Sequence, residues 1–558
     1  LKVIIGPLVN MIANPLMDVE SITHAVSALR GLTSDDNLKL ELLRLNALKE
    51  LVNLVDTIDK NELLIEIAAT IAGLANLIEA HVELLQPSAI NAIMVLALMD
   101  LNPQVQVHAA NTLASLASNP DSHPNIVYAN GIDNLVHLAM SRDANVRQGA
   151  TRALANLSSN RAYQGDLIHA GCLDVITAAL KDNDEASLFF SCIMCAIISE
   201  NNDYHKFICV KAILQPLSLL VTSLEQDNEL TRYALLSLSN LAANINSHGL
   251  IMDELQMQLT VFFELASSKD SEVQRYFAML LSNLATNETL HEFLSSRACF
   301  QAVENILNTD SMSTAKSALS FIVTMLRDNA TRQCFAGVSV KRILDIAQKW
   351  SDQPYQLSVI EVLSNITKAP KVRTAHKWYR NLGLIEHFLG QESIDVQQEA
   401  LRFFLNICDM EEVQRTMIGM KLLEYTTKAV RKGTMAQQSL GIHILCRLCA
   451  GIPEILEELK RNRIIQVIAP FVRSPHTAFR KYAFNGLGSF ASHEHTPVDL
   501  MDVNVVKSFL SLCESSQGDI EERRCCMYVL ANISFHLINQ EHLSDAGPFI
   551  FRSLPAFV

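Results

Sequence analysis

A four-residue motif, Leu-x-Asn-Leu or a near relative of it, returns about every 42 residues along nearly the whole chain. A period in this range is typical of stacked helical repeats, in which each repeat packs only on its neighbours. The sequence therefore predicts a solenoid rather than a closed globule. The clearest copies are Leu154-Ala-Asn156-Leu157, Leu238-Ser-Asn240-Leu241, Leu281-Ser-Asn283-Leu284, Leu363-Ser-Asn365-Ile366 and Leu530-Ala-Asn532-Ile533.

Composition agrees with helices. Hydrophobic residues make up 49% of the chain, aromatic residues only 6%, and 19 glycines and 15 prolines are few for 558 residues. Leucine- and alanine-rich sequences of this kind favour helices over strands or disorder. Because a fixed repeat overrides the usual relation between length and domain number, we expect an all-α fold and one solenoid over residues 1–558.

Charge and cysteine content narrow the partners and the compartment. With 45 basic and 59 acidic residues the net charge is −14, so the whole molecule should repel nucleic acid and anionic membrane, and we expect protein partners instead. The twelve cysteines are scattered, and those at Cys446, Cys449, Cys525 and Cys526 are typical of apolar packing in a reducing compartment. With no apolar run of 18 or more residues and no signal-peptide pattern at the start, the expected location is cytoplasmic, including nuclear or cytoskeleton-associated sites, without membrane insertion.

Taking the Asn of the motif as an anchor, equivalent positions recur at steps of 39 to 45 residues. Three of them, Ala196, Met325 and Ser489, are placed partly by spacing. The full set is Gly31, Asn76, Ser115, Asn156, Ala196, Asn240, Asn283, Met325, Asn365, Asn406, Arg447, Ser489 and Asn532.

Residues 125–160 show how one repeat is built. The sequence predicts a short helix from Asn125 to Gly131, a second from Ile132 to Met140 and a third from Asn145 to Ser158. Apolar residues in the second and third helices fall three and four apart, on one face. Glycine after the first helix would supply a turn with positive φ.

This order of short helix, helix and longer helix resembles the armadillo repeat family. The resemblance rests on Ala129-Asn-Gly-Ile132, His169-Ala-Gly-Cys-Leu173 and the recurring Ala-Leu-x-Asn-Leu, and it spans the whole chain. It implies a right-handed superhelix of about 13 three-helix repeats. Two-helix HEAT repeats have a similar period and are the alternative, but they do not call for the short glycine-terminated helix.

Both ends fall inside a repeat. Lys2 to Ile12 reads as a second helix and Val19 to Thr33 as a third, while Glu541 to Ala546 reads as a first helix and Pro548 starts another. Because a solenoid end needs a polar cap, we expect the sequence to be a fragment of a longer protein.

Signatures of catalysis and of cofactor binding are missing from the sequence. It holds no phosphate-binding loop, dinucleotide fingerprint, nucleophile elbow or His-Glu-x-x-His motif. Cys192-x-x-Cys195 and Cys446-x-x-Cys449 have the spacing of half a zinc site, yet each lies on a third helix, where residues three apart share a face. His493-Glu-His495 reads as a loop. We expect a non-enzymatic protein without cofactor or metal.

The anchor asparagines are the candidate binding residues. In armadillo proteins the third helices line a concave groove, and these residues resemble the asparagines that bind the main chain of an extended peptide. An amide offers both a donor and an acceptor, so it can bind backbone of any sequence. The alternative is that each amide bonds a neighbouring loop inside the solenoid. The set is Asn76, Asn156, Asn240, Asn283, Asn365, Asn406 and Asn532.

Four residues before the anchor lies the side chain that stands beside it on the same face. Import adaptors of the armadillo family carry tryptophan there, whereas this chain has Arg152, Leu236, Met279, Glu361, Arg402 and Tyr528. Its two tryptophans, Trp350 and Trp378, lie outside the pattern. The resemblance is therefore to catenin-like members rather than to import adaptors.

Basic residues one turn further back make part of this face positive. They are Arg232, Arg275, Lys481 and Arg524, with Arg147 nearby; Arg152 and Arg402 add to them. Such a stripe would attract acidic or phosphorylated segments. The alternative is that these side chains form salt bridges within the chain, to residues such as Glu229 and Glu272.

Two functions remain at this stage. The first is a scaffold or adaptor that binds extended segments of partner proteins in a concave groove. The second is a regulatory or docking array of a larger enzyme or of a cytoskeletal or ciliary assembly. A basic, aromatic run from Lys368 to Arg380, where Pro370 should break the helix, is either a partner contact or a solvated first helix.

Overall fold

The structure is a computed structural model. It describes residues 2–492, except 56, 58–59, 183, 223–228, 256–258, 328–330, 333–339 and 350–352, together with residues 520–535. All regular structure in this part of the chain is helical. The chain forms two compact units, Leu1–Asn287 and Glu288–Val558, which we call unit 1 and unit 2.

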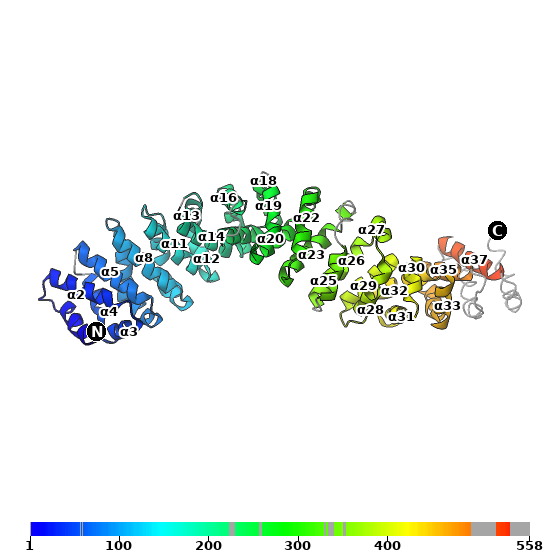
Figure 1. Ribbon diagram of the computed structural model, residues 1–558, viewed down its shortest axis with the longest axis horizontal. Helices are drawn as coiled ribbons and strands as arrows, with labels where there is room; N and C mark the ends of the chain where they lie inside the picture. The colour runs from blue at the N-terminus through cyan, green and yellow to red at the C-terminus, as the bar shows by residue number, and fades with distance from the viewer. Residues whose placement is uncertain are drawn as a thin grey trace. The chain divides into compact units, whose positions relative to one another are not determined.

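The longest helix of each repeat is the third, and in unit 1 successive third helices pack side by side in chain order (Figure 1). Several begin at an acidic cap whose carboxylate accepts backbone N–H groups, such as Asp143 and Asp270. The third helices of unit 1 are α2 (Val19–Leu32), α5 (Asn61–Ala75), α8 (Pro103–Ala117), α11 (Ala144–Ser158), α14 (Glu185–Ser199), α17 (Glu229–Leu241) and α20 (Ser271–Leu284).

Unit 2 repeats this arrangement. Its third helices are α23 (Met312–Met325), α26 (Gln353–Ile366), α29 (Ile394–Ile407), α32 (Met435–Leu448), α35 (Thr477–Ala491) and α37 (Ile520–Phe535), each packed on the next (Figure 1). The helices α32 and α35 approach closely because Gly486 has no Cβ: one built there would lie 2.8 Å from the Cα of Cys446.

Second helices pack against the third helices of the same repeats. They are α1 (Lys2–Ile12), α4 (Ala47–Val55), α7 (Pro87–Ala97), α10 (Gly131–Ala139), α13 (Cys172–Ala179), α16 (Lys211–Val221), α19 (Leu259–Glu264), α22 (Arg297–Leu307), α25 (Val340–Lys349), α28 (Leu382–Leu389), α31 (Leu422–Lys432) and α34 (Ile464–Ile468).

First helices are short, and several open with a 3-10 turn. In unit 1 they are α3 (Asp36–Arg44), η1 and α6 (Ile78–Ala80, His81–Leu84), η2 and α9 (Pro120–Ser122, His123–Tyr128), η3 and α12 (Arg161–Tyr163, Gln164–His169), η4 and α15 (Asn202–Tyr204, His205–Ile208) and η5 and α18 (Ile245–Ser247, His248–Leu255). In unit 2 they are η8 and α21 (Glu288–Leu290, His291–Leu294), α27 (Pro370–Ala375), α30 (Glu411–Met417) and α33 (Pro453–Arg461).

The three helices predicted for residues 125–160 are confirmed as α9, α10 and α11, with ends shifted by a few residues. The predicted turn is wrong in one detail. Positive φ falls on Asn130, at 59°, and Gly131 is instead the first residue of α10. Gly131 is needed for space, because a Cβ there would lie 2.6 Å from the carbonyl oxygen of Ile126. In the next repeat Gly171, at φ 100°, does take the predicted left-handed conformation.

The predicted second and third helices at the start of the chain are confirmed by α1 and α2. The helices expected from Glu541 and from Pro548 lie outside the described residues. No single described helix is long and apolar enough to cross a membrane; α5 taken with the 113°-bent segment Ile78–Leu84 reaches that length and hydropathy as a pair. The apolar side chains of α5 lie in the repeat core.

The run from Lys368 to Arg380 occupies the place of a first helix. As expected, α26 ends at Ile366 and Pro370 begins α27, where its missing N–H costs nothing. Trp378 is buried, and its indole N–H donates to the carbonyl oxygen of Arg373 at 3.1 Å. This run therefore forms a first helix whose Trp378 packs in the core of unit 2. The other tryptophan, Trp350, lies outside the described residues.

Candidate partner-binding face

A recurring hydrogen bond fixes the register of the repeats. In each case a buried side chain on the first helix donates to a carbonyl oxygen six residues earlier, at the end of the preceding third helix. The pairs are His81 with Ala75, His123 with Ala117, Gln164 with Ser158, His205 with Ser199, His248 with Ala242 and Gln414 with Cys408, at 2.7–3.0 Å. The anchor lies two residues before each of these carbonyls.

This register corrects two of the thirteen predicted anchors, and even spacing together with half-burial corrects a third. Gly73 replaces Asn76, Ile197 replaces Ala196, and Thr324 replaces Met325. Ala196 and Met325 are buried, whereas Ile197 and Thr324 are half-buried like the true anchors. With these changes the steps between successive anchors narrow to 41–43 residues.

Asn76 was misplaced because Leu74-Ala75-Asn76-Leu77 imitates the motif three residues out of register. The helix α5 ends at Ala75, so Asn76 is its C-cap. Its side chain is exposed, and its Oδ1 accepts a hydrogen bond from the hydroxyl of Ser115 at 3.1 Å.

Four anchor asparagines share one geometry. The side-chain Nδ2 of each donates across one repeat, to the carbonyl oxygen of the residue just before the preceding anchor. These bonds run from Asn156 to Ala114 (3.3 Å), Asn240 to Ala196 (3.2 Å), Asn283 to Ser239 (2.8 Å) and Asn406 to Ser364 (2.8 Å). We call this series the ladder, and the half-buried side of the third helices that carries the anchors the ladder face.

Part of each amide is thus used inside the fold, as in the alternative interpretation, but its acceptor is a carbonyl of the preceding third helix and not a loop. The Oδ1 atoms of these four residues accept no hydrogen bond within the described part of the chain. Because each amide is half-buried and held by its Nδ2, its oxygen is a fixed, accessible acceptor.

Two anchors differ from the others. Asn365 donates to the carbonyl oxygen of Glu361 in its own helix at 2.9 Å, and its Oδ1 accepts from Lys368 at 2.7 Å. The anchor after Asn406 is Arg447, which forms the equivalent bond by donating to the carbonyl oxygen of Leu405 at 3.3 Å. The side chain of Asn532, on α37, lies outside the described residues.

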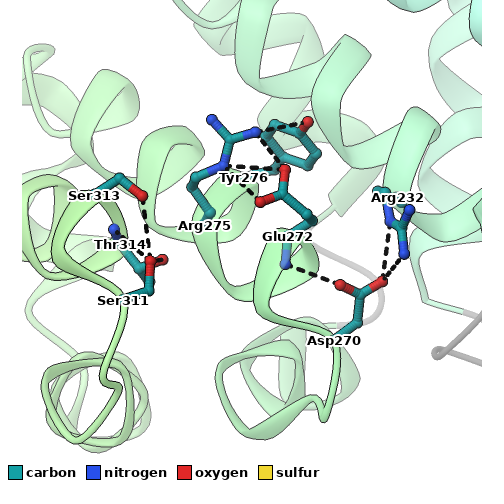
Figure 2. A network of polar contacts seen from close by, with 8 residues as sticks. All are labelled: Arg232, Asp270, Glu272, Arg275, Tyr276, Ser311, Ser313 and Thr314. Carbon is teal, nitrogen blue, oxygen red and sulfur yellow. Dashed lines mark hydrogen bonds and ion pairs between the residues drawn. The ribbon is translucent and has the colours of Figure 1, made fainter.

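The predicted basic stripe is largely paired with acidic groups of the chain (Figure 2). Arg232 binds the carboxylate of Asp270 at 2.7 and 3.0 Å, and Arg275 binds Glu272 and the hydroxyl of Tyr276. Arg147, nearby, pairs with Asp182 at 2.9 Å. The intramolecular alternative is therefore correct for these arginines, with Asp270 rather than Glu229 as the partner of Arg232.

The remaining predicted residues are spread over both units. Arg402 pairs with the buried Glu399, while Arg152 makes a long contact of 3.5 Å to the amide oxygen of Asn111. Lys481, on α35, and Arg524, on α37, are exposed. Burial, together with nearby Glu399, raises the pKa of Glu361, four residues before the anchor Asn365.

Sequence reasoning missed an aromatic pair on the ladder face of unit 2. His443, four residues before Arg447, stacks on Tyr482 with ring centroids 4.1 Å apart and planes 12° apart. Burial and the positive charge of Arg447 lower the pKa of His443 to about 4. The position four residues before an anchor could have pointed to His443. It was overlooked because the anchor of this repeat, Arg447, is not asparagine.

Cysteines of the two Cys-x-x-Cys pairs lie in the helix-packing core. Cys192 and Cys195 on α14 and Cys446 and Cys449 on α32 are buried, and burial raises the pKa of Cys195 and Cys449 to about 12. Thiols of this kind are poor nucleophiles. His493 and His495 lie outside the described residues. A hollow in unit 2 is lined by Tyr425, Lys428, Lys432, Thr434 and apolar or amide residues, without an acid, histidine or cysteine.

No protein-family model and no curated protein matches the chain. Solved structures do match. A chain of the cadherin and beta-catenin system, whose interaction a phosphorylation switch controls, gives a TM-score of 0.64 at 14% identity over 80% of this chain and 94% of its own. An engineered protein gives 0.61 at 22% identity over 72% of this chain and 99% of its own. UNC-45 from Drosophila melanogaster gives 0.52 at 12% identity, over 100% and 80%. The likeness shows an armadillo-type helical-repeat fold.

Proposed function

We propose that this armadillo-type repeat chain is a non-enzymatic scaffold that binds extended segments of partner proteins along its ladder face. The observation that carries the proposal is the geometry of the anchor amides. Asn156, Asn240, Asn283 and Asn406 each use Nδ2 within the fold and leave Oδ1 as an oriented acceptor. A main-chain N–H that is not already used in a helix or sheet is the natural donor to such a row.

The finer architecture belongs to this proposal. We infer about 13 repeats in one right-handed superhelix, with the ladder face as its concave side. The steps of 41–43 residues between corrected anchors across the whole sequence support one array. A cytoplasmic location and the absence of nucleic-acid partners are parts of the same proposal, supported by the charge of −14 and by the buried cysteines of the described residues, which form no disulfide there.

Binding of peptides selected from an unbiased library of 12-residue segments, measured by fluorescence anisotropy on the full chain, tests the function. Replacing Asn156, Asn240 and Asn283 together with alanine removes three acceptors at about 1 kcal/mol each, so affinity should fall about a hundredfold. Binding that survives this triple change unaltered would overturn the proposal.

A second variant serves as the control for effects on stability. Ser199→Ala removes one acceptor of the Asn240 amide, at 3.2 Å, and leaves its Oδ1 in place. We expect this variant to loosen the ladder while changing peptide affinity less than twofold. If Ser199→Ala and Asn240→Ala weaken the peptide equally, the asparagine acts only on the fold.

A further inference from the structure

The ladder face of unit 1 is apolar over three successive third helices. The helix α14 has no charged residue after Glu185, which is its first residue. In α14 half-buried apolar side chains stand at the anchor, four residues before it and eight residues before it, whereas in α17 and α20 the anchor is asparagine and the half-buried apolar or aromatic residues stand four residues before it and, in α17, also seven. We call them the apolar strip: Phe189, Ile193 and Ile197 on α14, Tyr233 and Leu236 on α17, and Met279 on α20.

Strip residues of neighbouring repeats touch. The rings of Phe189 and Tyr233 meet edge to face, with centroids 5.7 Å apart and planes 78° apart, and so join α14 to α17. Phe189 also meets Phe190 at 5.4 Å. Because α17 packs directly on α20 as well, the strip continues from one repeat to the next.

Charges beside the strip are already satisfied. The Arg232 guanidinium is bound by Asp270, and Arg275 by Glu272, with its guanidinium 4.4 Å from the centre of the Tyr276 ring. An acidic segment would have to displace these carboxylates, so the local electrostatic gain is small. The face is different in unit 2, where Glu361, Arg402 and His443 stand four residues before three successive anchors, Asn365, Asn406 and Arg447.

The same face also presents acceptors for a main chain. Asn156 precedes the strip, and Asn240 and Asn283 lie along it, each with its Oδ1 accessible. Packed helices lie about 8–10 Å apart and an extended residue spans about 3.3 Å, so each repeat matches two to three residues of an extended segment. A bound helix could not use these acceptors, because its N–H groups are paired internally.

From these contacts we propose that unit 1 selects extended segments of partner proteins that carry apolar and aromatic side chains, which pack on the apolar strip while Asn156, Asn240 and Asn283 bind the main chain. This inference rests on the proposed function and names its partner chemistry. It replaces the expectation of an acidic or phosphorylated ligand for this part of the chain.

Three panels of 12-residue peptides on the full chain test it, with alternate positions filled by Leu and Phe, by Glu, or by Lys, and with Ser between them. We expect the apolar panel to bind most tightly. The double variant Leu236→Ser, Met279→Ser should weaken it at least tenfold, and N-methylation of the peptide backbone should do the same. Leu219→Ser, at an exposed leucine of the second helix α16 of unit 1, is the matched control and should leave binding unchanged.

Each other outcome overturns the inference. If the acidic panel binds more tightly and depends on Asn240, the scaffold function stands and the apolar specificity falls. If no panel binds, both fall together. If the double variant instead abolishes self-association measured by analytical ultracentrifugation, the strip is an interface between copies of the chain. Hydrogen exchange on α17 and α20 verifies that the double variant remains folded.

Discussion

Arg232 and Asp270 form a two-pronged ion pair that joins one third helix to the start of the next. Both guanidinium contacts, at 2.7 and 3.0 Å, reach the same carboxylate oxygen, while the other oxygen accepts the backbone N–H of Glu272 at 2.9 Å. One side chain thus caps α20 and binds α17. Arg147 and Asp184, the residue before α14, form a looser version at 3.6 Å.

Asp270→Asn should destabilise the packing of α17 on α20 by about 1–2 kcal/mol at neutral pH, because Arg232 keeps its charge without a carboxylate. Burial raises the pKa of Asp270, but hydrogen bonds from Arg232 and from backbone N–H groups outweigh it, and the net pKa lies below 3.8. Because the pKa of Asp270 is lower in the folded chain, its ionised carboxylate stabilises the fold above about pH 4, and this contribution is lost as the pH falls below that value. Hydrogen exchange of α20 should therefore differ between variant and wild type at pH 6, and the difference should shrink as the pH falls below about 4.

The control is Asp203→Asn, which changes an exposed carboxylate in η4. It should leave exchange unchanged at pH 6 and at lower pH. A gap between Asp270→Asn and wild type that does not shrink as the pH falls below about 4 would show that the carboxylate charge is not what stabilises the pair.

Asn406→Ala should loosen unit 2 more than Asn365→Ala does. Asn406 donates to the carbonyl oxygen of Ser364 in the preceding third helix and to the hydroxyl of Thr367 just after that helix, whereas Asn365 donates within its own helix. The inter-repeat bond is worth about 1 kcal/mol. Hydrogen exchange of α26 and α29 measures the difference, and equal effects would show that the ladder bond adds nothing to repeat packing.

His123→Gln should be tolerated, while His123→Leu should cost about 1–3 kcal/mol, because leucine leaves the buried Ala117 carbonyl without a donor. Glutamine already replaces this histidine in two other repeats, since Gln164 and Gln414 occupy equivalent positions and form the same bond at 3.0 Å. Urea unfolding followed by circular dichroism compares the two variants. If glutamine proves as damaging as leucine, the imidazole ring acts by its shape and not by its donor.

Acid should weaken the contact between α32 and α35 through His443. Its pKa is about 4 in the folded chain against an ordinary 6.5, because burial and Arg447 oppose protonation. A lowered histidine pKa means that the unfolded chain binds the proton more tightly, so stability is lost as the pH falls from about 6.5 to about 4. His443→Phe keeps a ring beside Tyr482 and should remove this part of the pH dependence, measured by hydrogen exchange of α35. An unchanged pH profile would contradict the assignment.

The period and the helix order were predictable because both arise from local patterns of apolar residues. The register was harder. Leu74-Ala75-Asn76-Leu77 satisfies the motif in letters, and only the carbonyl of Ala75, bound by His81, shows that the motif is three residues out of place. Histidines at 81, 123, 205 and 248 recur at multiples of 41–43 residues and carried this information in the sequence.

The pairing of the basic stripe could not be predicted in the same way. Arg275 lies three residues from Glu272, within reach in one helix turn, and this neighbour was anticipated. Asp270 lies 38 residues from Arg232 and meets it only because one third helix begins beside the middle of another. Contacts of this kind depend on how helices pack, which periodicity alone does not give.

Ladder bonds all point in one direction, from a later anchor to the repeat before it. An anchor whose preceding repeat is removed loses the acceptor for a half-buried N–H, whereas removing the following repeat only frees a carbonyl oxygen that water can reach. Within each unit, shortening the array from its N-terminal side should therefore cost more than shortening it by one repeat from the other side. The repeats therefore form a directional array, in which deletions from the N-terminal side and from the C-terminal side are not equivalent.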